Sequence, residues 1–329
     1  MKTFVTGATG LVGGNLVRAL ISKGEAVRVF IREKSNTIAL NDLEVERHYG
    51  DIRDKDSLAL ALKDCCRVYH CAASVSQWRG NLSASKEINI NGTINIMEEA
   101  LRAGVERVVY VSTVDTLGLS SRENPADENS SHESMAKFRN PYVDTKYEAE
   151  IRAWEFVKKG LNLVVVNPTY MFGPWDVRPS SGQMILEVAR GMVVGYPGGG
   201  NNFVDVEDVV QGMIIAMESG RAGEKYILAN RDGNLTYREM FTLIAEVVGV
   251  KPPRFRIPYV LALAGGYMSD IYGKLTGSEP QINSVTARLG YAPHYFSPAK
   301  AIKELGIPQS PVEGAVRRAF EWFKKHGYL

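Results

Sequence analysis

The feature that most constrains the fold of this chain is an alternation of short β-branched runs with amphipathic helical patterns, which starts at its first residues. KTFVTG precedes the helical pattern LVGGNLVRALISKG, and RVVYVST is followed later by YVDTKYEAEIRAWEFVKKG. Continuous apolar strands separated by such helices predict a parallel sheet that is covered on both faces. We therefore expect a doubly wound α/β fold, in which ligands bind beyond the carboxyl ends of the strands.

The alternation weakens after Pro168, where glycine and proline cluster in MFGPWD and GYPGGGNN. We expect residues 1–170 to form a dinucleotide-binding domain and residues 171–329 to form a smaller, mostly helical substrate lobe. This boundary is soft, because FVDVEDVV and KYILAN in the second part resemble strands that could rejoin the main sheet.

Composition argues against a nucleic-acid partner, because the formal net charge is only +2 and the cations are scattered. The three cysteines, Cys65, Cys66 and Cys71, include no CxxC motif, which indicates reduced structural thiols in a cytosolic protein. The start MKTFVTGATG offers no apolar signal segment, so we expect a cytoplasmic protein.

The most apolar later run, IPYVLALAGGYM from Ile257, is too short to span a bilayer. We expect no membrane span and a packed helix at this run, with a role at a membrane surface left open.

Three glycines, Gly7, Gly10 and Gly13, stand three residues apart in VTGATGLVGG, at the first junction of a strand with a helix. Glycine there permits a tight turn and lets the backbone approach a pyrophosphate, while the helix N-terminus offers free N–H groups. The position of this loop predicts that it binds phosphate.

The second strand ends in FIRE, which puts Arg32 where an acidic residue would bind the ribose diol of NAD and an arginine would accept the 2′-phosphate of NADP. We expect NADP, with NAD as an alternative because the adjacent Glu33 could serve the diol. Asp51, at the end of the third strand, could reach the adenine amine or cap the following helix.

Tyr142 and Lys146 stand four residues apart on a predicted helix and therefore share one face. An ammonium group there would lower the pKa of the phenol and make it a usable acid or base. Ser112 and Thr113 end a neighbouring strand, where a hydroxyl group can donate a hydrogen bond to a substrate carbonyl. The convergence of these side chains on one edge of the sheet predicts proton transfer.

Almost the whole chain resembles the extended short-chain dehydrogenase/reductase family, also called the NAD-dependent epimerase/dehydratase family. The resemblance rests on TGATGLVG, GDIRD, HCAAS, EININGT, VVYVSTVDTLG, YVDTK, NPTYMFGP and FVDVEDV. Through VRVFIRE, HCAASVSQW and WFKKHGYL the chain looks most like the dihydroflavonol-reductase-like branch and the hopanoid-associated sugar epimerases. The resemblance implies a Rossmann-type domain with a small substrate lobe and an NAD(P)-dependent oxidoreductase activity.

The same resemblance implies roles for individual residues, and we expect no metal site. It assigns catalysis to Thr113, Tyr142, Lys146 and Asn89. It assigns cofactor contacts to Gly7, Thr9, Gly10, Leu11, Val12, Gly13, Arg32, Asp51, Ile52, Cys71, Ala72, Ala73, Lys146, Asn167, Pro168 and Thr169. We expect substrate contacts from Ser74, Trp78, Tyr170, Phe172 and Tyr196, and the aromatic residues among them would form a partly apolar pocket. The partner is then a small-molecule substrate, and a homodimer is a candidate assembly.

Three functions fit these residues. The first is an NADP-dependent reductase or dehydrogenase acting on a ketone or secondary alcohol of a small, partly apolar molecule. The second is a nucleotide-sugar epimerase, and the third is a non-catalytic NADP sensor, which is the weakest because a sensor needs neither Tyr142 nor Lys146.

Two arginines that bind the diphosphate in nucleotide-sugar members of the family separate the first two functions. Their places read GGGNNFVDVED and RLGYAPHYFSPAKA in this chain, where Arg288 is the one candidate substitute. A dehydratase would place adjacent Asp and Glu after Thr113, but here Val114 precedes Asp115.

Overall fold

The centre of the computed structural model, which describes residues 2–329, is a seven-stranded parallel sheet. Its spatial order is β10 (Lys225–Leu228), β6 (Leu163–Pro168), β5 (Arg107–Val111), β4 (Arg67–His70), β1 (Lys2–Thr6), β2 (Ala26–Ile31) and β3 (Glu46–Tyr49). The strand order reverses where β1 lies between β2 and β4, so the crevice for a ligand lies beyond the carboxyl ends of β1 and β4.

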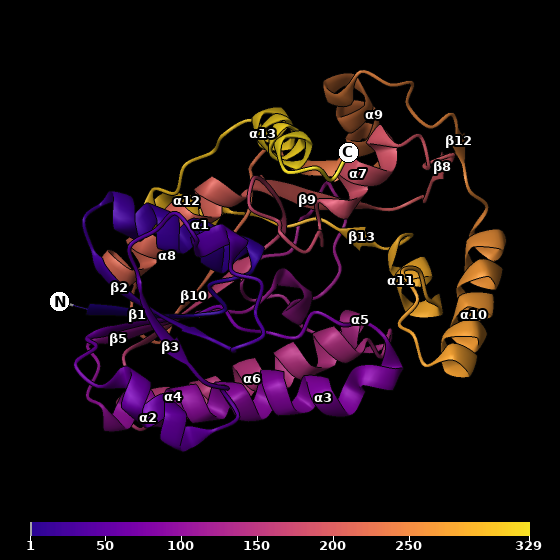
Figure 1. The fold of residues 1–329 in the computed structure, drawn as a ribbon. Coiled ribbons are helices and arrows are strands. Elements are labelled where there is room, and N and C mark those ends of the chain that lie inside the picture. Colours follow the sequence, from indigo (N-terminus) through magenta and orange to yellow (C-terminus); the bar gives the residue numbers. More distant parts are fainter. Residues whose placement is uncertain (1) are drawn as a thin grey trace.

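Helices cover both faces of this sheet (Figure 1). One face carries α1 (Leu11–Ser22), α8 (Val206–Ser219) and α12 (Ala299–Leu305). The other carries α2 (Lys55–Leu62), α3 (Leu82–Lys86), α4 (Gly92–Arg102) and α6 (Pro141–Val157), with the short α5 (Glu133–Ala136) beside α6. Each face has its own apolar core, which explains why the strands read as continuous β-branched runs.

A second sheet lies beyond the carboxyl edge of the first. It contains β7 (Tyr170–Phe172), β9 (Gly200–Asp205), β11 (Asn234–Thr236) and β13 (Pro293–His294), with β9 pairing with the other three. Helices α7 (Gln183–Ala189), α9 (Tyr237–Val248) and α13 (Val312–Lys325) pack around it and share one apolar core.

The two later segments that resembled strands of the main sheet behave differently. KYIL forms β10, which pairs with β6, so that expectation is confirmed. The expectation for FVDVEDVV is wrong, because its first residues belong to β9 in the second sheet and the rest begins α8. Asp205 ends β9 and caps α8, because its side chain accepts a hydrogen bond from the Glu207 N–H (3.0 Å).

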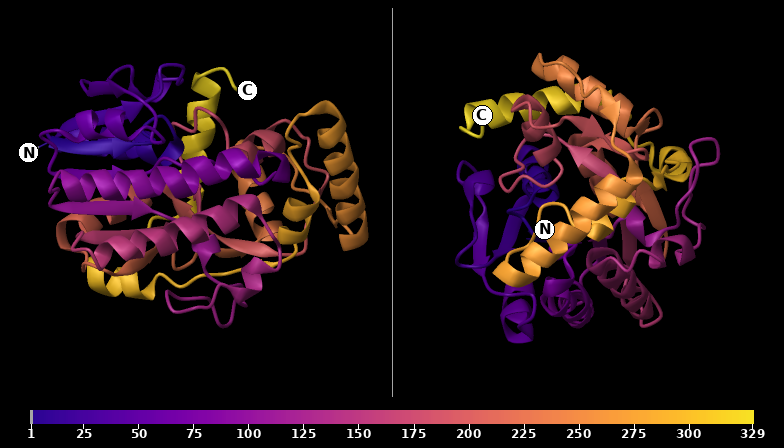
Figure 2. Two further views of the ribbon diagram at one scale, coloured as in Figure 1. Left: turned by 90° about the horizontal axis from the view of Figure 1, so that it is seen from below. Right: turned by 90° about the vertical axis from the view of Figure 1, so that its right-hand side faces the viewer.

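The outer end of the molecule is formed by β8 (Gly195–Tyr196), which pairs with β12 (Phe255–Arg256), and by α10 (Tyr259–Thr276) and α11 (Ser284–Leu289). Helix α10 packs against α11 and lies at the edge of the molecule in Figure 1 and across it in the right panel of Figure 2. The apolar run forms a helix that packs against α11, as expected, but only one side of it is packed, since most of its large side chains are exposed.

Candidate active site

The glycine loop after β1 fits a bound pyrophosphate. Gly7 has φ +69°, and a Cβ atom on it would lie 2.6 Å from the Ala72 nitrogen. A Cβ atom on Gly13 would lie 2.2 Å from the Gly7 oxygen, so α1 approaches the loop as closely as a glycine permits. Gly10 is the N-cap of α1 and supplies no side-chain cap, which leaves the first N–H groups of the helix free for an anion. Thr9, Leu11 and Val12 are half-buried around this helix start.

The far end of the crevice is formed by the ends of β2 and β3. The Arg32 guanidinium is exposed and makes no hydrogen bond or ion pair within residues 2–329, so it is available to a ligand. Asp51 accepts hydrogen bonds from Arg53 Nη2 (2.7 Å) and Nε (2.9 Å), and this arginine, with a smaller contribution from Arg32, holds the pKa of Asp51 below its usual value. Asp51 does not cap α2, because Asp54 takes that role.

The walls of the crevice follow β4 and β6. Ala72 donates its N–H to Thr6 Oγ1 (3.2 Å), which fixes the chain after β4 beside the glycine loop. Burial raises the pKa of the Cys71 thiol to about 12, so this thiol stays protonated. Ala73 is exposed, and Ile52 is buried in the core behind the loop.

The segment after β6 is held by side chains. Asn167 Nδ2 donates to the Thr113 carbonyl (2.9 Å), while its buried Oδ1 has no partner within residues 2–329. Thr169 donates to Asn202 Oδ1 (3.0 Å), which ties the end of β6, at Pro168, to the second sheet. These bonds join the Thr113 loop, β6 and β9 at one place.

Helix α6 carries Tyr142 and Lys146 and starts at the carboxyl edge of the sheet. Pro141 occupies its first position, and Asn140 caps it by accepting from the Tyr142 N–H (3.0 Å). Both signals are local, which is why the helix start was predictable from the sequence. Asn140 also donates to Gln77 Oε1 (2.9 Å), so the cap connects α6 with the loop after β4.

Lys146 is almost completely buried. Its Nζ donates to the Tyr110 hydroxyl (2.9 Å) and the Val111 carbonyl (2.7 Å). Burial lowers the pKa of Lys146 to about 7, although the nearby Glu150 acts in the opposite direction. Tyr110 in turn stacks on His70, whose pKa burial lowers to about 3, so this layer beneath Lys146 is uncharged.

Tyr142 is half-buried, and burial raises the pKa of its phenol, with a smaller contribution in the same direction from Asp115. The nearby Thr113 side chain acts in the opposite direction on this pKa. The expectation that Lys146 lowers the pKa of Tyr142 is not met in this structure, because Lys146 bonds to Tyr110 and Val111 and is itself close to losing its charge. Tyr142 is therefore a protonated phenol at neutral pH, which suits a proton donor.

Asn89 lies in a π-helical turn, Glu87–Asn91, between α3 and α4. Its Nδ2 donates to the Thr145 hydroxyl (2.9 Å) and the Ser74 carbonyl (3.0 Å), and its Oδ1 accepts from the Ser74 N–H (2.7 Å). Such turns inside α-helices frequently mark functional sites. Here the turn lets one buried amide join the loop after β4 to the helix that carries Tyr142.

The two hydroxyl residues at the end of β5 have different surroundings. Ser112 donates to Glu150 Oε2 (2.6 Å) and belongs to a buried network that also includes Thr116. Thr113 Oγ1 lies 3.3 Å from Asp115 Oδ2 and affects the pKa of Tyr142. The structure thus separates Thr113, on the side of Tyr142, from Ser112, which holds β5 against α6.

The sequence patterns missed an acidic group and a histidine beside Thr113. Asp115 and the buried His294 lie close enough for each to change the pKa of the other; burial raises the pKa of Asp115 and lowers that of His294. His294 comes from β13, far along the chain, and no local pattern predicts that contact. Asp115 was visible in the motif after Thr113, where it follows Val114.

The five predicted substrate residues do not all lie near Tyr142. Ser74 lies beside Asn89, and the half-buried Trp78 covers Gly80 in the loop after β4. Tyr170 is half-buried, whereas the ring of Phe172 is completely buried and stacks on Phe203 (centroid distance 5.8 Å).

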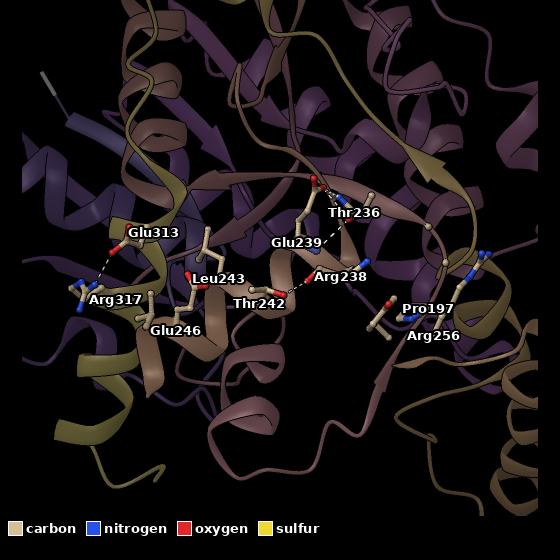
Figure 3. A pocket seen from close by; sticks show the side chains of 14 residues that line it. Pro197, Thr236, Arg238, Glu239, Thr242, Leu243, Glu246, Arg256, Glu313 and Arg317 are labelled. Atoms are coloured by element: carbon tan, nitrogen blue, oxygen red, sulfur yellow. Dashed lines mark hydrogen bonds and ion pairs between the residues drawn. The ribbon is translucent and has the colours of Figure 1, made fainter. Parts of the chain in front are cut away.

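Tyr196 lies farther out, in an open hollow of about 900 Å³ on the second lobe (Figure 3). Within its lining Arg317 pairs with Glu313 (2.6 Å), and the lining residue Glu239 pairs with Arg122 outside the hollow (3.0 Å). None of the proposed catalytic residues lines this hollow, so it is separate from the site around Tyr142.

Comparisons with known proteins agree with this geometry. The model of the NAD dependent epimerase/dehydratase family matches residues 3–229. The chain is 35% identical to sterol demethylase protein B of Methylococcus capsulatus, over the whole of both chains. It is 33% identical to a provisionally named dihydroflavonol 4-reductase of Synechocystis, over 99% of this chain and 95% of that protein.

Among solved structures, the crystal structure of a nucleoside-diphosphate-sugar epimerase from Pseudomonas aeruginosa superposes with a TM-score of 0.82. It is 25% identical, and the match covers 100% of this chain and 99% of that chain.

Proposed function

Since the chain belongs to the NAD-dependent epimerase/dehydratase family, we propose that it is an NADP-dependent reductase acting on a ketone, or in reverse a secondary alcohol, of a small, partly apolar molecule. The general activity, that of an NAD(P)-dependent oxidoreductase of the extended short-chain type, follows from the family and from the relatives that are named as reductases. The proposal adds the choice of cofactor, the substrate class and the residue roles.

The observation that carries the proposal is the convergence of Thr113, Tyr142 and Lys146 at the sheet edge that also carries the glycine loop. The nicotinamide, when bound, supplies or accepts the hydride. Tyr142, held protonated, donates a proton to the carbonyl oxygen of the substrate, and Thr113 donates a hydrogen bond to the same oxygen. Lys146 lies one turn further along α6, where it would hold the ribose of the bound cofactor and could return protons to the phenol.

The proposal of NADP rests on Arg32. A guanidinium group that has no partner within residues 2–329, just after β2, can bind a 2′-phosphate with two parallel hydrogen bonds. Glu33 is also exposed there, so NAD remains the alternative cofactor.

The proposed substrate class rests on the lack of evident arginine partners for a diphosphate at the two places where nucleotide-sugar enzymes of the family carry them. Asn202 is buried and joins Thr169 to the backbone of Asn230, so it serves the second sheet. Arg288 donates from Nε to the Ser284 carbonyl (3.3 Å) and from Nη2 to the Phe138 carbonyl (3.1 Å), which ties its side chain to the protein. Burying a pyrophosphate without cationic partners is costly. The names of the two relatives, a sterol demethylase protein and a dihydroflavonol reductase, favour a polycyclic apolar substrate instead.

A nucleotide-sugar epimerase remains the second candidate, because the solved structure from Pseudomonas aeruginosa carries that name and matches the whole chain. Calorimetric titration of UDP-glucose and dTDP-glucose into the NADP-loaded protein separates the two. We expect no binding in the low micromolar range, which would correspond to about 8 kcal/mol of binding free energy. Binding of that strength would replace the reductase proposal with the epimerase.

A further inference from the structure

Helix α10 presents an apolar face to solvent. Its apolar side chains are exposed along the whole length of the helix, with Val260 73%, Met268 72% and Leu275 82% exposed. Leu261, Tyr267, Ile271 and Tyr272 are exposed by more than half as well. At 100° per residue these positions fall on one broad stripe of the helix that points away from the protein.

The inner face of α10 carries the small and polar residues. Gly266 and Gly273, seven residues apart, are its buried positions, and a Cβ atom on Gly266 would lie 2.8 Å from the Ser284 Cα atom. Asp270 also faces inward and accepts from the Ser284 N–H (3.3 Å). Gly266 therefore lets α10 lie close against the start of α11, and Gly273 lets it approach Ser278 and Pro280, while most of its bulky apolar side chains are exposed.

This pattern is the reverse of a helix on a water-exposed surface, where the apolar stripe faces the core. Contiguous apolar patches of this kind mark sites of association with a membrane or another protein. Helix α10 does not cross a bilayer, since none of the helices in residues 2–329 is long and apolar enough to do so. An interfacial position, with the helix lying in the plane of the bilayer surface, fits its length and its one-sided apolar face.

The charges near this face favour an anionic surface. The stretch 249–282 contains four cations, Lys251, Arg254, Arg256 and Lys274, and two carboxylates, Asp270 and Glu279. All four cations are exposed, whereas both carboxylates are engaged with the protein: Asp270 bonds to α11, and Glu279 accepts from Ser76 (2.7 Å) and Asn81 (2.9 Å).

We propose that the apolar face of α10 docks on the surface of an anionic lipid bilayer. The outward side chains enter the boundary between headgroups and acyl chains, and the flanking cations contact the phosphates. A second copy of the chain is the less favourable occupant, because it would bring two stretches together that each carry four cations against two carboxylates.

The docked helix lies next to the loops that surround the substrate site. Glu279 holds the loop of Ser76 and Asn81, which follows the crevice residues after β4, and Arg288 of α11 donates to the Phe138 carbonyl just before α6 (3.1 Å). Docking would therefore bring the mouth of the site to the bilayer, from which an apolar substrate can enter.

Vesicle flotation with the full chain tests the proposal without any substrate. We expect the protein to float with vesicles of phosphatidylcholine and phosphatidylglycerol, to float poorly with pure phosphatidylcholine, and to be partly released by salt. Leu275→Glu and Met268→Glu should each lower the bound fraction at least about tenfold at limiting lipid. Leu60→Glu, at an exposed leucine on α2 (68%), is the matched control and should float like the wild type.

Circular dichroism and cooperative thermal unfolding confirm that each variant is folded before its flotation is compared. Failure of the wild type to float with anionic vesicles, or equal flotation of the α10 variants, would overturn the proposal. A dimer in sedimentation that Leu275→Glu converts to a monomer, with no flotation, would show instead that α10 is an interface between two copies. None of these outcomes depends on whether the proposed reductase activity is correct.

Discussion

At the scale of single residues, the buried Lys146 decides how the site responds to pH. Burial removes its ammonium group from water and disfavours the charged form, although the nearby Glu150 acts in the opposite direction. The sequence spacing of Tyr142 and Lys146 was enough to predict that the two share a site. The pKa of each could not be predicted, because it depends on partners from β5 that no spacing reveals.

The first prediction follows from the pKa of about 7 for Lys146, against 10.5 for a lysine in water. Between these values the unfolded chain binds a proton that the folded chain does not, so the free energy of unfolding should rise with pH by up to about 1.4 kcal/mol per unit. Denaturant unfolding of the cofactor-free wild type and Lys146→Met from pH 7 to about pH 9.5 measures this. The wild type should gain stability relative to the variant, and a constant difference would mean that Lys146 keeps its usual pKa.

The second prediction concerns Arg32. Arg32→Ala should weaken NADP binding by about 1.5 to 3 kcal/mol, the range of a charge-assisted hydrogen bond, and should leave NAD binding nearly unchanged. Lys34→Ala removes an exposed cation two residues further on and serves as the control. Equal losses for both cofactors in Arg32→Ala, measured by fluorescence titration, would show that the arginine does not recognise the 2′-phosphate.

At the scale of elements, the junction of β1 with α1 holds two glycines for different reasons. Gly13→Ala should destabilise the fold by about 1 to 3 kcal/mol, because its Cβ atom would lie 2.2 Å from the Gly7 oxygen. Gly10→Ala is the comparison, since its Cβ atom would lie 3.5 Å from the same oxygen, an ordinary contact. Thermal unfolding should separate the two variants, and equal stability would contradict the close approach of α1 to the loop.

Elements with a strong local pattern were predictable, and those whose partners are distant were not. The strands of the main sheet show uninterrupted β-branched runs, and α6 shows a proline start with an asparagine cap. Segment 200–205 reads as a similar strand, yet its partners β7, β11 and β13 come from three distant segments. Apolar content alone cannot show whether α10 faces the core or the solvent, because that depends on which of its faces carries Gly266 and Gly273.

At the scale of the whole molecule, the crevice is formed by segments that the sheet order brings together from the first 170 residues, and β9 and β13 approach it from the second lobe. The glycine loop, the loop after β4 and the Thr113 segment were predictable as one site because parallel strands place their carboxyl ends at one edge. The position of His294 near Asp115 was not predictable, since it requires the second sheet to lie beyond that edge. The position of Tyr196 on a separate hollow depends on the same arrangement.

The most direct test of the central claim follows NADPH absorbance while the wild type and Tyr142→Phe are offered a panel of apolar ketones, steroid and flavonoid ketones included, alongside nucleotide sugars. We expect the wild type to consume NADPH in proportion to alcohol formed from at least one ketone. Tyr142→Phe should bind NADPH normally and turn over at least about 100-fold more slowly, as expected when a general acid is lost. Near-normal turnover by the variant, or formation of a sugar epimer by the wild type with no net change in NADPH, would contradict the claim.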